Sequence, residues 1–98
     1  METIEIYTTI NGNTVFSLMV DGCEVGRIVC NITSDLLRVG HTGVNLSHRK
    51  KGYGRKLIDA AVEYARQNNL KMITQCGFVA MIFNKYPERY GDIRNKWN

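Results

Sequence analysis

The hydrophobic period of the chain changes once, near residue 49, and this change constrains the fold more than any other feature. Before it, short runs rich in β-branched residues alternate between apolar and polar positions, as in half-buried strands. After it, apolar residues recur every three or four positions, as on one face of a helix. With 98 residues, the chain is long enough for one hydrophobic core and too short for a second. We therefore expect a single α+β domain that spans residues 1–98.

Four strands are expected in the first half. Asn11-Gly12 and Asp21-Gly22 separate the first three, and such pairs favour hairpins because both residues tolerate positive φ. A polar turn at residues 34–35 precedes the fourth strand. The expected strands cover residues 3–10, 14–20, 24–32 and 36–44. Two-residue turns between neighbouring strands predict an antiparallel meander.

The fourth expected strand carries a candidate for chemistry, His41. Strict alternation along a strand places His41 on the same face as Leu37 and Val39. It places Thr42 on the opposite face. We therefore expect His41 to point toward whatever Leu37 and Val39 contact.

The second half is expected to begin with a helix and a strand. Apolar or small residues from Gly54 to Ala65 form one stripe, which predicts an amphipathic helix of about four turns that ends near residues 68–69. The composition of residues 70–76 is typical of a short strand. Because a helix connects this strand to residues 36–44, it should run parallel to them through a right-handed crossover.

A C-terminal helix follows, and Pro87 ends it. Its apolar stripe runs from Phe78 through Phe83 to Tyr86, and we expect these aromatic residues in the core. Residues 88–98 are expected to form a polar tail that docks on the body of the domain through Tyr90, Ile93 and Trp97.

The segment RKKGYGRK, residues 49–56, holds five Lys or Arg residues and two glycines. Since the rest of the chain is nearly balanced in charge, this segment supplies the whole net charge of +4. It lies where a helix is expected to begin, and helix N-termini offer unpaired N–H groups and about half a positive charge to an anion. Gly52 and Gly54 allow the backbone to close around such a ligand. The alternative is a basic, flexible helix start without a ligand, and the pattern alone does not separate the two.

The sequence argues against three other classes of ligand for the basic segment. A dinucleotide-binding fingerprint needs G-x-G-x-x-G and a triphosphate-binding loop needs G-x-x-x-x-G-K-[ST], and the basic segment matches neither. Binders of single-stranded nucleic acid pair a basic groove with exposed stacking aromatics, whereas the aromatics here follow core periodicity. We expect neither a nucleotide triphosphatase nor a nucleic-acid partner.

Cysteine usage and the lack of targeting segments indicate the compartment. Cys23, Cys30 and Cys76 include no C-x-x-C pair, so we expect neither a disulfide framework nor a zinc site. No apolar run approaches the roughly 20 residues that span a bilayer, and the N-terminus lacks the features of a secretory signal. These observations predict a cytoplasmic protein with free thiols, no metal and no membrane partner.

Several spaced motifs together resemble the acetyl-CoA signature of the GNAT superfamily of N-acetyltransferases. They are His41-Thr42-x-Val44, the R-x-x-G-x-G turn of residues 49–54, the helix that ends in YARQNNLKMI, Cys76 followed by Phe78-Val79, and NKYPERYGDI. More narrowly, the chain is similar to a small, single-domain GNAT-like subfamily. The resemblance covers roughly residues 13–93.

The resemblance implies the minimal GNAT-like fold and acetyl-CoA as the cofactor. The diphosphate of coenzyme A would lie on backbone amides of residues 50–55, and the pantetheine arm along residues 43–45, in the cleft where two parallel strands separate. The cofactor-binding residues that it implies are Gly43, Val44, Asn45, Arg49, Lys50, Lys51, Gly52, Tyr53, Gly54, Arg55 and Lys56.

His41 and Cys76 are the catalytic candidates. His41 is the expected base, since imidazole accepts protons near neutrality. Cys76 is expected beside the thioester, where its thiolate would take the acetyl group in a ping-pong route with His41 across the cleft as its activator. The alternatives are a half-buried histidine bonded to the backbone and a cysteine that only fills space. Cys23 and Cys30 are expected to be structural, and His48 is expected to face solvent.

Two departures from the family pattern leave two classes of function open. Full-length GNAT enzymes carry two helices between their first strands that help to form the acceptor pocket, but here tight turns join those strands. The tyrosine that many members use as a general acid falls on Asn84. We expect an acetyl-CoA-dependent N-acyltransferase whose amine acceptor is a metabolite, a peptide or a protein. The alternative is a non-catalytic acyl-CoA carrier or sensor.

Overall fold

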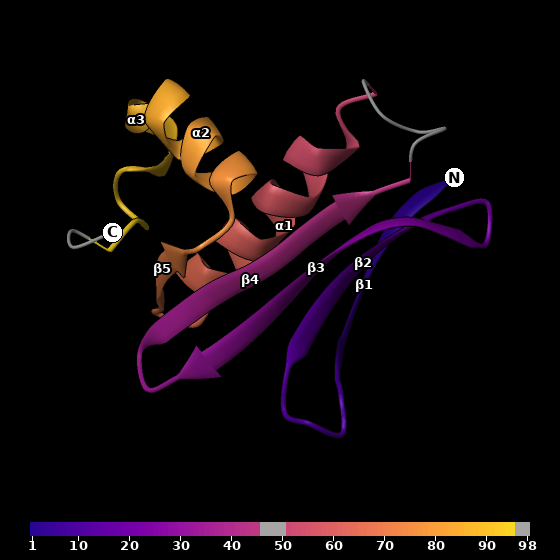
Figure 1. Ribbon diagram of the computed structural model, residues 1–98, viewed down its shortest axis with the longest axis horizontal. Coiled ribbons are helices and arrows are strands. Elements are labelled where there is room, and N and C mark those ends of the chain that lie inside the picture. Colours follow the sequence, from indigo (N-terminus) through magenta and orange to yellow (C-terminus); the bar gives the residue numbers. More distant parts are fainter. Residues whose placement is uncertain (46–50, 96–98) are drawn as a thin grey trace.

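The computed structural model describes residues 1–45 and 51–95, and within them five strands form one sheet in the order β1-β2-β3-β4-β5 (Figure 1). The strands are β1 (Glu2–Thr8), β2 (Thr14–Val20), β3 (Cys23–Thr33), β4 (Leu36–Val44) and β5 (Lys71–Thr74). β1 to β4 pair antiparallel, and β5 pairs parallel to β4. The predicted meander followed by a parallel fifth strand is confirmed.

The turns between the strands follow the predicted chemistry with one difference in length. Asp21 and Gly22 have φ values of 50° and 84°, so two residues of positive φ join β2 to β3. The first hairpin is wider than expected, because the Thr9 N–H donates to the Asn13 carbonyl at 2.8 Å and residues 9–13 lie outside the strands. β4 has the predicted bounds.

The described part contains α1 (Tyr53–Gln67), α2 (Gly77–Lys85) and α3 (Pro87–Tyr90), which gather near β4 and β5 in Figure 1. α1 contacts β2, β3, β4 and β5. The predicted stripe is confirmed, since its buried side chains are Leu57, Ile58, Ala61, Val62 and Ala65. None of these helices is long and apolar enough to cross a membrane.

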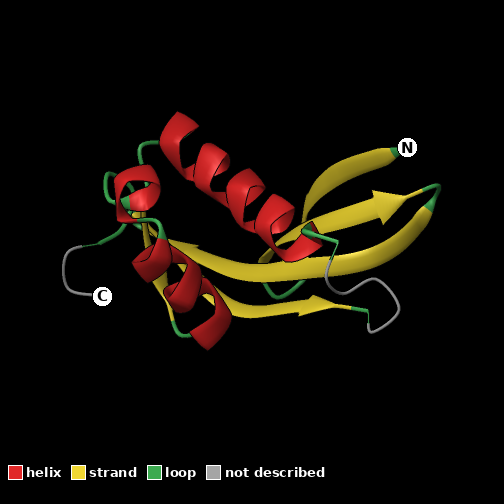
Figure 2. Ribbon diagram, turned by 90° about the horizontal axis from the view of Figure 1, so that it is seen from above, coloured by secondary structure: helices red, strands yellow, loops and turns green. Residues whose placement is uncertain are grey.

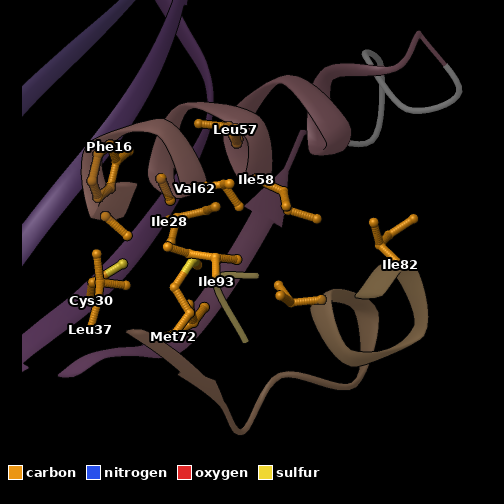
Figure 3. Close-up of a cluster of buried hydrophobic side chains, with 14 of the residues drawn as sticks. Phe16, Ile28, Cys30, Leu37, Leu57, Ile58, Val62, Met72, Ile82 and Ile93 are labelled. Carbon is orange, nitrogen blue, oxygen red and sulfur yellow. The ribbon is translucent and has the colours of Figure 1, made fainter. Parts of the chain in front are cut away.

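One hydrophobic cluster fills the space between α1 and the strands, and Figure 3 shows its side chains pointing toward one another. Phe16 and Ile28 lie beneath α1, and Met72 extends the cluster to β5. The core has no room for a side chain at position 26, because a Cβ on Gly26 would lie 2.9 Å from the Gly43 carbonyl oxygen and 3.2 Å from Leu57 Cδ1. This glycine therefore sets how closely β3, β4 and α1 approach.

The C-terminal residues are more ordered than a polar tail. Pro87 ends α2 as expected and also begins α3, where a missing N–H is tolerated. Tyr90 and Ile93 are 1% and 3% exposed, which confirms that both dock on the body of the domain. Trp97 lies outside the described residues.

The docked segment extends the sheet beyond β5. The Met72 N–H donates to the Ile93 carbonyl at 2.8 Å, and the Asn95 N–H donates to the Met72 carbonyl at 2.9 Å. The Tyr90 hydroxyl also donates to Asp59 Oδ1 at 2.6 Å, which ties α3 to α1. These bonds hold β5 and the helices beside it in place.

The expectation that Phe78 lies in the core is wrong. Val79, Ile82 and Phe83 form the buried stripe of α2, whereas Phe78 is 40% exposed. Phe78 belongs to the first turn of α2, and its ring lies against Gly54 in the first turn of α1. It therefore lies at the border of the core, beside the predicted phosphate-binding turn.

Candidate functional site

β4 and β5 part at the point where the cofactor cleft was expected. Their register ends with Val39 opposite Thr74, and one more bond follows from the Gln75 N–H to the Val39 carbonyl at 3.2 Å. β4 then continues to Val44, while the chain after Gln75 turns into α2. The end of β4 and the start of α1 lie at the same end of the molecule in Figure 2.

A β-bulge at Gly40 reverses which side chains of β4 face the core in the residues that follow it. Cys30 pairs with Val39 but Val29 pairs with His41, so Gly40 is the extra residue in β4. Beyond the bulge, Thr42 pairs with the buried Ile28 and therefore faces the core.

The expected orientation of His41 is therefore wrong, because a bulge breaks the strict alternation on which it rested. Leu37 and Val39 are fully buried, whereas His41 is exposed on the face away from the core. Its Nε2 lies 3.2 Å from the position that a Cβ on Gly43 would take, so the ring lies over Gly43 on that face. His41 and Thr42 therefore lie on opposite faces of β4.

Cys76 lies at the N-terminus of α2, where it is the N-cap residue in extended conformation. Its N–H donates to Thr74 Oγ1 at 2.9 Å, which fixes the turn out of β5. Partial burial raises the pKa of the Cys76 thiol, but the Val79 N–H, the Thr42 side chain and the Phe78 N–H favour the thiolate and outweigh burial, so the pKa is lowered overall. A larger fraction of the Cys76 thiol is therefore ionised at neutral pH than in an ordinary cysteine.

The other two cysteines have different surroundings. Cys30 lies in the core, where burial raises the pKa of its thiol to about 12. Cys23 is exposed at the β2–β3 turn. Cys76 combines partial exposure with a lowered thiol pKa.

The start of α1 has features that are typical of an anion-binding site. Gly52 is the N-cap in the left-handed conformation, with φ 77°, and no side chain caps the helix. The Lys56 N–H makes an intrahelical bond to the Gly52 carbonyl at 3.1 Å. By helix geometry, the amides of Gly54 and Arg55 precede that bond and have no intrahelical acceptor. The first turn contains no acidic side chain that would repel an anion.

The basic side chains near this turn differ in whether they already interact with other groups of the protein. Lys56 forms an ion pair with Glu2, and the Arg55 guanidinium stacks over the Tyr86 ring at 4.3 Å. Lys51 is exposed. Tyr53 is buried, with the Lys56 ammonium 5.6 Å from the centre of its ring. Arg49 and Lys50, which were expected to bind the cofactor, and His48 lie outside the described residues.

The residues expected along the pantetheine arm lie at the end of β4 and just after it. Gly43 and Val44 pair with β3 and follow Val39, the last residue of β4 in the β4–β5 register. The Asn45 N–H is already used, because it donates to the Val25 carbonyl at 2.8 Å. Asn84, at the position of the family's tyrosine, accepts a hydrogen bond from Arg94 Nη1 at 2.6 Å.

Sequence reasoning missed Thr42 and Phe78 as members of this site. The signal for Thr42 was Gly40, since a glycine inside a strand often marks a bulge. Phe78 could have been recognised from its position in the first turn of a helix, because a side chain there can lie at the edge of the core instead of inside it. Among the described residues, no three His, Cys, Asp or Glu side chains gather as metal ligands.

Residues 15–93 match the family model of GCN5-related N-acetyl-transferases. The chain belongs to this family. A GCN5-like protein from Staphylococcus aureus is 30% identical, with a TM-score of 0.70, and the match covers 97% of this chain and 91% of that one. The GCN5-related fold thus accounts for nearly the whole described chain.

Larger members of known structure share the fold at lower identity. A GNAT family acetyltransferase from Elizabethkingia anophelis, solved with acetyl-CoA bound, is 12% identical with a TM-score of 0.72, over 87% of this chain and 74% of that one. The ribosomal-protein-alanine N-acetyltransferase of Brucella melitensis is 20% identical with a TM-score of 0.64, over 74% of this chain. The chain spans 61% of the length of the Brucella enzyme.

Proposed function

We propose that this protein binds acetyl-CoA and transfers the acetyl group to an amine, with Cys76 as the residue that carries the group. One observation carries the proposal. The uncapped start of α1 after Gly52 lies at the end of the molecule where β4 continues past its last pair with β5, and Cys76 follows that pair on the other strand. The acetyl-CoA bound to the relative from Elizabethkingia anophelis supports the choice of ligand.

In this proposal the backbone binds and the side chains react. Amides of residues 52–55, with Lys51 nearby, hold the diphosphate, and Gly43 and Val44 lie along the pantetheine arm. The Cys76 thiolate attacks the thioester carbonyl, the bond from the acetyl carbon to the sulfur of coenzyme A breaks, and that sulfur leaves as a thiolate. An amine then attacks the acetyl group on Cys76, which releases the amide and restores the Cys76 sulfur.

His41 keeps a role in the proposal, but a different one from activating Cys76. The exposed imidazole lies on the opposite face of β4 from Thr42. From that face it is placed to take the proton of an amine that approaches from outside the core. The acceptor is a metabolite, a peptide or a protein.

A non-catalytic acyl-CoA carrier or sensor is the second candidate, and two observations favour it. Residues 9–13 join β1 to β2, and they leave no space for the helices that shape the acceptor pocket of larger relatives. Asn84 is bonded to Arg94 in place of a tyrosine general acid. For either function we propose one domain acting in the cytoplasm, where its three thiols stay reduced.

Intact-protein mass spectrometry after incubation with acetyl-CoA tests the proposal. We expect an adduct of one acetyl group on the wild type that is lost in Cys76→Ser and kept in Cys23→Ser, the matched exposed control. Free coenzyme A should then be released faster when an acceptor amine is added, and His41→Ala should slow this second step only. Tight binding of acetyl-CoA in calorimetry with no adduct and no release would favour the sensor, and an absence of binding would refute both candidates.

A further inference from the structure

The hydroxyl of Thr42 is a buried polar group that makes no hydrogen bond in this structure. Thr42 Oγ1 is shielded from solvent and has no hydrogen-bond partner of good geometry among the described residues. A buried hydroxyl without a partner is unfavourable by about 1–3 kcal/mol, and such groups are few in native proteins. The position is set by the bulge at Gly40, which turns Thr42 toward the core and away from solvent.

We propose that Thr42 is a positioning residue for Cys76. Its hydroxyl donates a hydrogen bond to the Cys76 sulfur once the thiol has lost its proton. This inference rests on the proposed role of Cys76. It adds to that role a named donor on β4, opposite the amides that the start of α2 supplies.

The surroundings of the sulfur support this assignment. Thr42 follows Val39 on β4 and Cys76 follows Thr74, and Val39 and Thr74 are the last pair in the β4–β5 register. From these positions the side chain and the main chain of Thr42 lower the pKa of the Cys76 thiol, as the Phe78 and Val79 N–H groups do from α2. Neutral sulfur is a weak acceptor, whereas a thiolate is a strong one. The hydroxyl therefore lacks a good partner while the thiol is neutral and gains one when the thiol ionises.

The groups that act on the sulfur are neutral donors, so the site responds to pH through Cys76 itself. The leading contributions come from burial and from hydrogen bonds of Thr42, Phe78 and Val79, and none comes from a charged side chain. His41 lies on the opposite face of β4. Removing one donor should therefore shift the titration of one thiol and leave the rest of the protein unchanged.

The test follows the rate of alkylation of Cys76 by iodoacetamide as a function of pH, read by peptide mass spectrometry. The variants are Thr42→Val, which keeps the shape and loses the hydroxyl, and Thr42→Ser, which keeps the hydroxyl. Losing the donor raises the pKa of the thiol, so the profile of Thr42→Val should move to higher pH. At neutral pH its alkylation should be about tenfold slower, the effect of one hydrogen bond to a charged group. Thr42→Ser should restore the wild-type profile.

Two internal controls separate this role from a structural one. Cys23 is exposed in the same molecule, and its alkylation should be equal in all three proteins. The melting temperature of Thr42→Val should equal or exceed that of the wild type, because the variant removes an unpartnered buried hydroxyl. A lower melting temperature together with an unshifted profile would show a structural hydroxyl and overturn the proposal.

The experiment needs no acetyl-CoA, so its outcome is independent of the transferase activity. An unshifted profile in Thr42→Val, or a shift that Thr42→Ser does not reverse, would overturn the role of Thr42 even if Cys76 is acetylated. A shift that serine reverses would establish the role of Thr42, even if acetyl-CoA leaves no adduct and the transferase proposal fails.

Discussion

At Gly54, the first turns of α1 and α2 come into contact. A Cβ on Gly54 would lie 2.8 Å from Phe78 Cε2 and 2.9 Å from Cζ, closer than side chains approach. The glycine therefore serves two purposes, since it leaves space for the Phe78 ring and allows a ligand to approach the amides of the turn. Phe78, in turn, covers part of the predicted phosphate-binding turn from the α2 side.

The contact predicts a coupling between the two positions. With Phe78→Ala in place, Gly54→Ala should stabilise the protein by about 0.5–1 kcal/mol, because alanine is the better helix former. In the wild type the same change should be less favourable or destabilising, because the new methyl group displaces the ring. Urea denaturation of the four proteins measures the difference. Equal effects of Gly54→Ala in both backgrounds would show that the Phe78 ring and the first turn of α1 are not coupled in stability.

At the scale of elements, the separation between β3, β4 and α1 depends on a missing side chain. Gly26 faces the core on β3, and a Cβ there would meet the Gly43 carbonyl of β4 and the Leu57 side chain of α1. The carbonyl cannot move without disturbing the pairing of β3 with β4. This close approach is what places Thr42 and Val44 near the helices.

Gly26→Ala should therefore destabilise the protein by about 1–3 kcal/mol, as overpacking does in a dense core. Gly40→Ala in the same pair of strands is the matched control, because a Cβ at Gly40 would lie 3.6 Å from the Val29 carbonyl, an ordinary contact. Its free energy of unfolding should change by no more than about 0.5 kcal/mol. Thermal and urea denaturation compare the two, and equal effects would contradict the importance of the Gly26 contact.

At the scale of the whole molecule, the segment that supplies the net charge leads directly into the first turn of α1. The net charge of +4 comes from residues 49–56, while β1 carries Glu2 and Glu5 and no basic residue. Lys56 is already paired with Glu2. Binding of an anionic cofactor should therefore depend on the remaining cations and on the backbone of the turn.

Coenzyme A binding should weaken with salt, because the screening length falls from about 10 Å at 0.1 M to about 3 Å at 1 M. We expect a severalfold rise in Kd over this range in calorimetry. An uncharged acetyl thioester without the diphosphate is the control, and its rate of acetylating Cys76 should not depend on salt. Salt-independent binding of coenzyme A would show that the basic segment does not hold the diphosphate.

The local pattern determined the elements and their order. Asp21-Gly22 set a tight hairpin, the stripe through Leu57 and Ala61 set α1, and the change of period set the parallel crossover, because all three depend on residues close together in the chain. The basic turn before α1 was also evident, since Gly52 takes the left-handed conformation that only glycine adopts easily.

Tertiary structure alone decided which side chains share the site. The sequence predicted that His41 shares a face with Leu37 and Val39, but the pairing of β3 with β4 accommodates one extra residue at Gly40 and so turns Thr42 toward the core. A bulge depends on how two strands match, and Phe78 meets Gly54 only because α2 folds back beside α1. Sequence periodicity shows which face of a single helix or strand is apolar. Which of these faces pack against each other depends on contacts between residues far apart in the chain.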